Sequence, residues 1–386
     1  MDAITKLKNE DDFHELVRRT IERMHEHGTK EHKEFTQELL TSYNAANALN
    51  KDKKTYPQNW AAYNEAQQKE KILLMQLLDE LLCYVKFPEE KHTGRTPFPR
   101  RDRIFYLIMQ AYNVKSSRRC ISDLEIAKKF NYVSKTPHFN SILGIQKDPT
   151  ITAFLNHLVQ ISGLPLQRVE KDFAVDSSGF STSIFGRWFD VRKGTDTQKR
   201  MYKKAHLTCG VITNIITAVK ITPGTYNDSP ELPSLVNTTK RIFDVREVSA
   251  DKGYISKDNL EAIWDIGAIP FIPFKSNVSK DSVHKNGFVW QKMLRFYTEY
   301  PEEFYHHYHK RSNIESTFNM LKSKFGRNLR SRTETGQTNE ILAKCLCHNL
   351  CVLIQEAYEL NIEINFEKCA EQEIAQKDTE NAQIKD

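Results

Sequence analysis

Phe173-Ala174-Val175-Asp176 is a short apolar run that ends in an acidic residue. The same pattern returns in Glu247-Val248-Ser249-Ala250-Asp251. Short apolar runs with polar boundaries are typical of buried strands, and residues that leave the ends of adjacent strands converge at one edge of an α/β sheet. We therefore expect Asp176 and Asp251 to lie close together at such an edge.

The sequence around these two runs predicts a mixed α/β sheet. Alternating β-branched residues on either side of Thr213-Asn214 indicate a hairpin. Further segments have strand-like patterns, at 203–212, 215–222 and 269–274. Helical patterns lie between or after them, at 228–240, 259–265, 288–325 and 338–360. The order strand, hairpin, helix, strand, helix, strand favours a mixed α/β fold.

Residues 1–165 are expected to be mostly helical. Apolar residues recur at helical spacing in three segments, 13–24, 69–86 and 104–112. The stripe at 69–86 must bury against something, and either a helical bundle or a dimer contact would satisfy it.

Three start signals predict short helices in the second half of this region. They are Ser122 with Glu125 as a capping box, Thr136 before Pro137, and Asp148 before Pro149. The first two predict a helix, a short turn and a helix, as in a helix-turn-helix unit. The basic loop 91–103 lies nearby in the sequence, so this region is compatible with DNA docking. The alternative is a plain helical core domain.

The composition is that of a folded protein with a mild positive charge. The 386 residues are 39% hydrophobic and 27% charged, with a net charge of +6 that favours a polyanionic partner. No segment approaches the ~20 apolar residues of a membrane span, and the first residues are too acidic for a secretory signal. The seven cysteines indicate no disulfide framework. We expect a soluble protein of the cytoplasm.

A third acid, Glu315, stands alone in a basic segment. Between 310 and 332 it is the only acid among seven basic residues. A structural ion pair is one explanation. Three converging carboxylates would repel one another, however, and such a trio is normally held by a divalent metal. Two Mg²⁺ ions can activate the attacking oxygen and stabilise the leaving oxygen of a phosphodiester.

Residues Tyr308-x2-Arg311-x3-Glu315-x6-Lys322 match the Tyr-(2)-Arg-(3)-Glu-(6)-Lys signature of DDE transposases from prokaryotic insertion sequences. The chain thus resembles the insertion-sequence-four and -five type of that family. Phe173-Ala-Val-Asp-Ser-Ser-Gly-Phe180 resembles the family's first-Asp block, and Ala250-Asp-Lys-Gly-Tyr254 resembles its second. The resemblance extends from about residue 169 to residue 360.

The resemblance implies an RNase H-like fold with a five-stranded mixed sheet. Asp176 would lie on the first strand, Asp251 on the fourth and Glu315 on a following helix. In this family the three acids bind two Mg²⁺ ions, which Mn²⁺ can replace, and Asp176 would bridge both. The resemblance also gives Tyr308, Arg311 and Lys322 contacts with transposon-end DNA. Their spacing of three, four and seven residues, counted with Glu315, places all four on one helix face.

The implied function is DNA transposition. The protein would bind the terminal inverted repeats of its element, cut phosphodiester bonds and join the freed 3′-hydroxyls to target DNA. It would act as a DNA-bound homodimer in the prokaryotic nucleoid. Two alternatives are an RNase H-like nuclease or resolvase without strand transfer, and a domesticated DNA-binding protein without catalysis.

This interpretation divides the chain into three parts. Residues 1–165 form a helical domain for DNA-end binding and dimerisation, 166–360 form the RNase H-like catalytic domain, and 361–386 form a polar tail.

A second basic segment precedes the predicted hairpin. We expect it to contact the DNA backbone, although a solvated loop is the alternative. Its basic residues are Arg187, Arg192, Lys193, Lys199, Arg200, Lys203 and Lys204. Trp188 is a candidate for stacking on an unpaired base, against the simpler interpretation of half-buried packing.

Two groups of potential metal ligands have simpler interpretations. Cys345, Cys347, His348 and Cys351 lie within one apolar helical segment, where cysteine acts as a small buried hydrophobe. The histidines of 305–309 are predicted to face phosphate or solvent at a helix start.

Overall fold

The computed structural model describes residues 59–90, 94, 96–182, 202–276, 278 and 287–366. The chain divides into two compact units, Met1–Trp60 and Ala61–Asp386, and almost all described residues belong to the second. The predicted helix at 13–24 and residues 367–386 of the predicted tail lie outside the described residues.

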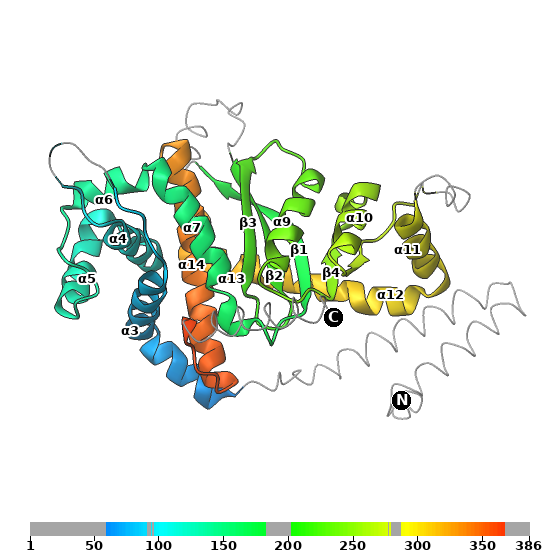
Figure 1. Cartoon of the computed structure of the whole chain (residues 1–386), viewed down its shortest axis with the longest axis horizontal. Helices are drawn as coiled ribbons and strands as arrows, with labels where there is room; N and C mark the ends of the chain where they lie inside the picture. Colours follow the sequence, from blue (N-terminus) through cyan, green and yellow to red (C-terminus); the bar gives the residue numbers. More distant parts are fainter. Residues whose placement is uncertain are drawn as a thin grey trace, which may run out of the picture. The chain divides into compact units, whose positions relative to one another are not determined.

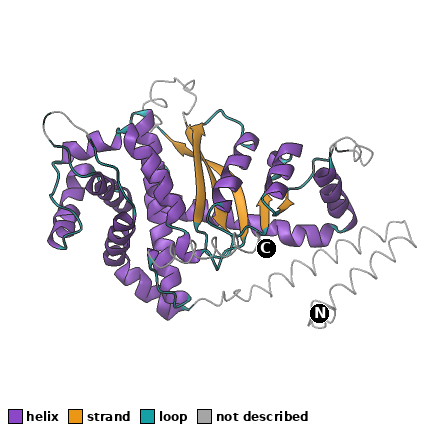
Figure 2. Ribbon diagram, viewed as in Figure 1, coloured by secondary structure: helices purple, strands orange, loops and turns teal. Residues whose placement is uncertain are grey.

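A five-stranded mixed sheet forms the centre of the second unit (Figures 1 and 2). The strand order is β3-β2-β1-β4-β5. The central strand β1 pairs antiparallel with β2 and parallel with β4, while the outer pairs are β2 with β3, antiparallel, and β4 with β5, parallel. The bounds are Asp172–Ser181 (β1), Tyr202–Gly210 (β2), Ile216–Pro223 (β3), Glu247–Ala250 (β4) and Ile269–Phe271 (β5). The predicted mixed five-stranded sheet is confirmed.

Helices cover both faces of this sheet (Figure 2). One face is packed by α7 (Pro149–Ile161), α13 (Ser312–Phe325) and α14 (Glu334–Glu359). The other carries α9 (Leu232–Lys240) and α10 (Lys257–Asp265). The remaining helices are α3 (Trp60–Tyr84), α4 (Arg100–Asn113), α5 (Ser117–Lys129), α6 (Phe139–Gln146), α11 (Phe288–Glu299) and α12 (Pro301–Tyr308). The 3₁₀ turns are η2 (Leu164–Leu166), η3 (Ser229–Glu231), η4 (Lys252–Tyr254) and η6 (His309–Arg311).

Alternation along β1 produces two separate apolar cores. Phe173 and Val175 point into the core beneath α9 and α10, whereas Ala174 and Phe180 point into the core beneath α13 and α14. The second of these cores also contains buried residues of the helices at 60–161. The apolar packing is therefore continuous across residue 165, where the α/β domain was predicted to begin.

The apolar stripe at 69–86 lies in α3 and is buried within a single chain. Leu74, Leu78 and Leu81 have no exposed surface. Ile72, by contrast, is 68% exposed. Most of the stripe is thus buried in an intramolecular helical bundle, which was one of the two predicted arrangements.

Two of the predicted helix starts are wrong and one is confirmed. The helix α5 begins at Ser117, and its cap is Ser116, whose Oγ accepts a hydrogen bond from Arg119 N. Ser122 lies inside that helix. The next helix starts two residues later than predicted, with His138 as its cap. The third prediction holds, because Asp148 Oδ1 accepts a hydrogen bond from Thr150 N at 2.9 Å.

Of the helices that the structure describes, none combines the length and apolar character that crossing a bilayer requires.

The predicted hairpin is held by a buried carboxylate. Glu170 accepts hydrogen bonds from Ile212 N at 3.1 Å and from Thr213 Oγ1 at 2.7 Å. Its side chain also fills the space above Gly210, because a Cβ at that position would lie 2.2 Å from Glu170 Cδ. Glycine is therefore required here for lack of room.

We expect Gly210→Ala to reduce the free energy of unfolding by about 1–3 kcal/mol, as overpacking typically does. Gly144→Ala in α6 is the control, because a Cβ there meets no atom within 4 Å and alanine favours a helix interior by up to ~1 kcal/mol. Urea denaturation measures both. Equal stability of the two variants would contradict the crowding at Gly210.

Candidate active site

The register between β1 and β4 brings the acids of both strands to one face of the sheet. Asp172 pairs with Glu247, and Val175 pairs with Ala250. Since Val175 and Ala250 point into the core beneath α9 and α10, Asp176 and Asp251 point to the opposite face. That face carries α13.

Asp176 lies in the middle of its strand, which corrects one prediction. The apolar run at 173–175 suggested a strand that ends at the acid, but β1 continues to Ser181 because β2 pairs with it along its full length. Asp251 does follow directly after β4, as predicted. The two acids therefore meet in the sheet, with only Asp251 at a strand end.

Arg311 links the first acid to the third. Its Nη1 donates to Asp176 Oδ2 at 3.0 Å, and its Nη2 donates to Glu315 Oε1 in the first turn of α13. The side chain of Glu315 is 60% exposed, whereas that of Asp176 is 23% exposed. One guanidinium thus neutralises two carboxylates that come from different elements.

The three acids interact electrostatically. Burial raises the pKa of Asp176, and the charges of Asp251 and Glu315 raise it further. A hydrogen bond from Ser177 N and the Arg311 charge act in the opposite direction without outweighing them. The site therefore holds more negative charge than Arg311 compensates.

The donor set suits a divalent metal ion. Carboxylate oxygens are the ligands that Mg²⁺ and Mn²⁺ prefer, and the excess negative charge around Asp176 would be relieved by a cation. Within the described residues, no three His, Cys, Asp or Glu side chains are gathered tightly enough to hold an ion. The guanidinium of Arg311 lies between Asp176 and Glu315, so these carboxylates would fit a divalent ion only with the guanidinium moved aside.

Of the other two signature residues, Lys322 lies on the face that carries α13, whereas Tyr308 packs partly against the core beneath α9 and α10. Lys322 Nζ donates to Ser178 Oγ on β1 at 2.6 Å and lies 5.1 Å from the centre of the Phe180 ring. Burial lowers the pKa of Lys322. Tyr308 is half-buried, and the centre of its ring lies 6.0 Å from the Arg311 guanidinium.

The prediction that the four signature residues share one regular helix is wrong in detail. Tyr308 ends α12, Arg311 ends η6, and the other two lie in α13. The backbone remains helical through the junction, with φ and ψ of −60° and −36° at Tyr308 and −54° and −32° at Arg311. The four side chains therefore still reach one region of the sheet.

Most of the predicted basic segment lies outside the described residues. This concerns Arg187, Trp188, Arg192, Lys193, Lys199 and Arg200. The two described lysines form ion pairs, Lys203 with Glu334 at 3.3 Å and Lys204 with Asp228 at 2.9 Å.

Tyr254 lies in η4, three residues after Asp251, and the sequence alone predicts no role for it. It is among the largest fully buried side chains, and burial followed by the Asp176 charge raises its pKa. Its backbone N–H donates to Asp251 O at 2.9 Å, which closes the turn after β4. Its position at the end of the block Ala250–Tyr254 was the one feature of the sequence that pointed to Tyr254.

Two cysteines of the predicted apolar helix are buried, as is His348 beside them. Cys345 and Cys347 are fully buried in α14, and His348 Nε2 lies 2.9 Å from Asn214 O. Burial lowers the pKa of His348 to about 4. His306 and His309 are exposed, which agrees with the predicted solvent-facing orientation. The prediction is wrong for His307, because its ring stacks on Phe271 with centroids 4.5 Å apart.

An open hollow of about 720 Å³ adjoins Asp251. Lysines and tyrosines line it, together with Pro273, Phe274 and Leu294. The lysines are Lys252 and Lys275, and the tyrosines are Tyr297 and Tyr305. This lining is suited to a phosphate backbone and to base contacts beside the acids.

A family model described as Transposase DDE domain matches residues 167–350. The match contains Asp176, Asp251 and Glu315 together with the sheet that carries them. This part of the chain is a DDE transposase domain. No curated protein and no solved structure matches it. DDE transposases act on DNA and generally use divalent metal ions, so the fold and the carboxylates described above belong to a DNA-processing enzyme family with an RNase H-like domain.

We expect Asp176→Asn to melt at or above the wild-type temperature at pH 7.5 without metal. A carboxyl whose pKa is raised on folding opposes folding above its unfolded pKa, and the amide removes that penalty. Mn²⁺ should stabilise the wild type by up to about 2.7 kcal/mol at one hundred times its Kd, and should not stabilise the variant. Thermal melting measures both effects.

Asp244→Asn is the matched control, because Asp244 is 74% exposed and its ion pairs with Lys171 at 3.9 Å and Lys240 at 3.6 Å are on the surface. It should behave as the wild type with and without Mn²⁺. A metal-induced stabilisation of Asp176→Asn equal to that of the wild type would contradict the assignment of Asp176 as a ligand.

Proposed function

We propose that this protein is a DNA transposase of an insertion sequence of the four or five type. It binds the terminal inverted repeats of the element, cuts phosphodiester bonds and transfers the freed strands to target DNA. The observation that carries the proposal is the ion-paired group Asp176, Arg311 and Glu315, with Asp251 on the same sheet face.

Asp176, Asp251 and Glu315 would hold two Mg²⁺ ions, or Mn²⁺ in their place. When bound, these metals supply the Lewis-acid chemistry that polarises the attacking and leaving oxygens. The carboxylates come from β1, from the end of β4 and from α13, so the fold has to be complete before the site exists. No side chain of the chain needs to act as a covalent nucleophile.

Arg311 and its neighbours recognise the DNA. With a divalent cation bound to Asp176 and Glu315, the guanidinium of Arg311 would be available to pair with a phosphate. Lys322 provides a second cation, and Tyr308 provides a phenol beside Arg311. The hollow beside Asp251 adds Lys252 and Lys275, which continue a cationic path away from the acids.

The remaining regions serve the assembly of two DNA ends. Residues 1–165 bind the ends and support a DNA-bound homodimer, and 166–360 perform the chemistry. The helix α5 presents exposed cationic residues, including Arg118 and Arg119, around an open hollow next to Lys115, which supports a DNA contact there.

Glu315→Gln should retain binding to an inverted-repeat duplex and lose cleavage by at least about 100-fold, because the amide keeps the shape of the side chain without its charge. The control is Glu299→Gln at an exposed i,i+4 pair with Arg295, which should cleave as the wild type does. A gel assay of binding and nicking in Mg²⁺ measures both. Undiminished cleavage by Glu315→Gln would overturn the metal role of this residue.

Strand transfer distinguishes transposition from the two alternative functions. A duplex with a precleaved 3′-hydroxyl end should be joined to plasmid DNA in Mg²⁺ or Mn²⁺, and EDTA should abolish joining because it removes the metal. Cutting without joining would indicate a nuclease or resolvase. Binding without either reaction would indicate a non-catalytic DNA-binding protein.

A further inference from the structure

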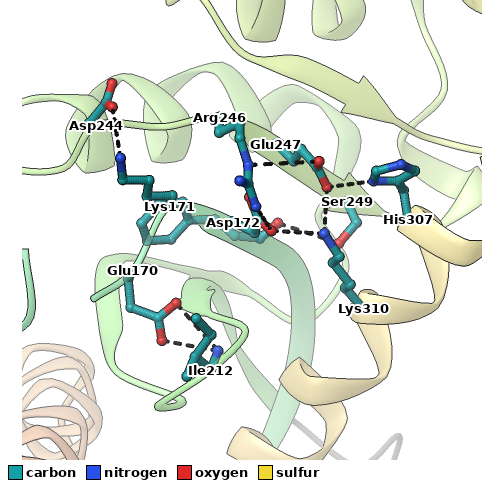
Figure 3. Close-up of polar contacts among 11 residues, drawn as sticks. Glu170, Lys171, Asp172, Ile212, Asp244, Arg246, Glu247, Ser249, His307 and Lys310 are labelled. Atoms are coloured by element: carbon teal, nitrogen blue, oxygen red, sulfur yellow. Dashed lines mark hydrogen bonds and ion pairs between the residues drawn. The ribbon is translucent and has the colours of Figure 1, made fainter. Parts of the chain in front are cut away.

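A second group of charged residues lies on the same sheet face as the acids, at the starts of β1 and β4 (Figure 3). Asp172 and Glu247 are 6% and 7% exposed, which is rare for carboxylates. Lys310 and His307 reach them from η6 and α12, and Arg246 reaches them from the residue before β4. The group therefore ties a helical segment to two strands.

Lys310 is the centre of this group. Its Nζ donates to Asp172 Oδ2 and to Glu247 Oε2, both at 2.8 Å, and so spans the two parallel strands. Arg246 also donates to Asp172, from Nε to Oδ1 at 2.8 Å and from Nη2 to Oδ2 at 2.6 Å. His307 Nδ1 lies 2.9 Å from Glu247 Oε2. Figure 3 shows both carboxylates directed toward the Lys310 ammonium.

The spacing connects this group with the acids of the proposed active site. Asp172 precedes Asp176 by four residues, and Glu247 precedes Asp251 by four residues. Residues four apart in a strand share a face. Lys310 and Arg311 are neighbours in the chain, so a single turn is attached to β1 at Asp172 through one residue and at Asp176 through the next.

The energetics favour a role in orientation. Burying a carboxylate carries a desolvation penalty, and an apolar cluster at this place would stabilise the fold as well or better. Burial alone would raise the pKa of Asp172, but the hydrogen bonds from Arg246 and Lys310 lower it below its ordinary value. Both buried carboxylates thus have hydrogen-bond donors. Because hydrogen bonds are directional, those from Lys310 specify where η6 lies on the sheet.

We propose that Lys310 is a positioning residue, which fixes η6 across the starts of β1 and β4 and thereby places Arg311 and Glu315 beside Asp176 and Asp251. This inference rests on the proposed function of the acids. Lys310 itself touches neither DNA nor metal in this role. Its effect passes through the helical backbone into the first turn of α13.

The test compares Lys310→Met with Lys171→Met in the full-length protein. Both substitutions remove one positive charge close to β1. The side chain of Lys171, however, is 52% exposed, and its Nζ lies 3.9 Å from Oδ2 of the exposed residue Asp244. Lys310→Met leaves Asp172 with Arg246 and Glu247 with His307, so the buried carboxylates keep partners. Thermal melting verifies that both variants are folded.

Three readouts are measured on each variant. Hydrogen exchange of the peptide 308–316 reports the position of η6 without reference to any activity. A Mn²⁺ titration followed by electron paramagnetic resonance gives the metal affinity without DNA. Strand transfer at varied DNA concentration separates kcat from KM. We expect Lys310→Met to exchange faster in 308–316, to bind Mn²⁺ about 10-fold more weakly, and to lower kcat at least about 10-fold with KM unchanged.

Two further variants make the comparison robust against a general loss of stability. Lys310→Arg keeps the charge and should restore most of the metal affinity and kcat. His307→Phe keeps a ring to stack on Phe271 and loses only the contact with Glu247, so it should shift the same readouts in the same direction by a smaller factor.

The proposal is overturned if Lys310→Met equals Lys171→Met in metal affinity and kcat. It is also overturned if Lys310→Met exchanges faster throughout the chain and not only in 308–316, and Lys310→Arg fails to restore metal affinity and kcat. A wild-type protein that binds no Mn²⁺ and joins no DNA would contradict the proposed function itself. Wild-type binding and joining together with an unaffected Lys310→Met would contradict only the positioning role.

Discussion

The structure of the site depends on the bridge that Arg311 makes between Asp176 and Glu315. One carboxylate belongs to the central strand and the other to a helix more than one hundred residues later, and the guanidinium holds both. Without a positively charged partner the acids would repel one another, since all three carry like charge. Burial, and then the charges of Asp251 and Glu315, raise the pKa of Asp176. The same arginine therefore holds the strand acid and the helix acid together.

The sheet makes this arrangement possible through alternation. Phe173 and Val175 bury themselves beneath α9 and α10, which leaves the intervening side chains of β1 to the face covered by α13. Polar residues there would be costly unless they were paired, and each of them has a partner. Lys310 pairs with Asp172 at the start of the strand, and Arg311 pairs with Asp176 in its middle. Lys322 donates a hydrogen bond to Ser178 further along the strand.

The helical region is part of the same packing. The core beneath α13 and α14 continues into α3 and α4, and Glu70 of α3 pairs with Lys324 at the end of α13. Glu70 also accepts a hydrogen bond from Tyr112 of α4 at 2.8 Å. The helix that carries Glu315 is thus supported at its start by the sheet and at its end by the helical region.

Local patterns in the sequence determined the elements and the identity of the acids. Apolar runs, the turn at Thr213-Asn214 and the isolated acid in a basic segment required only neighbouring residues to be recognised. The tertiary structure decided what depends on distant partners. Pairing with β2 extended β1 past Asp176, and the cap at Ser116 displaced the one expected at Ser122. The partners of Lys310 lie 63 and 138 residues away, and such contacts form only when strand register and helix packing bring them together.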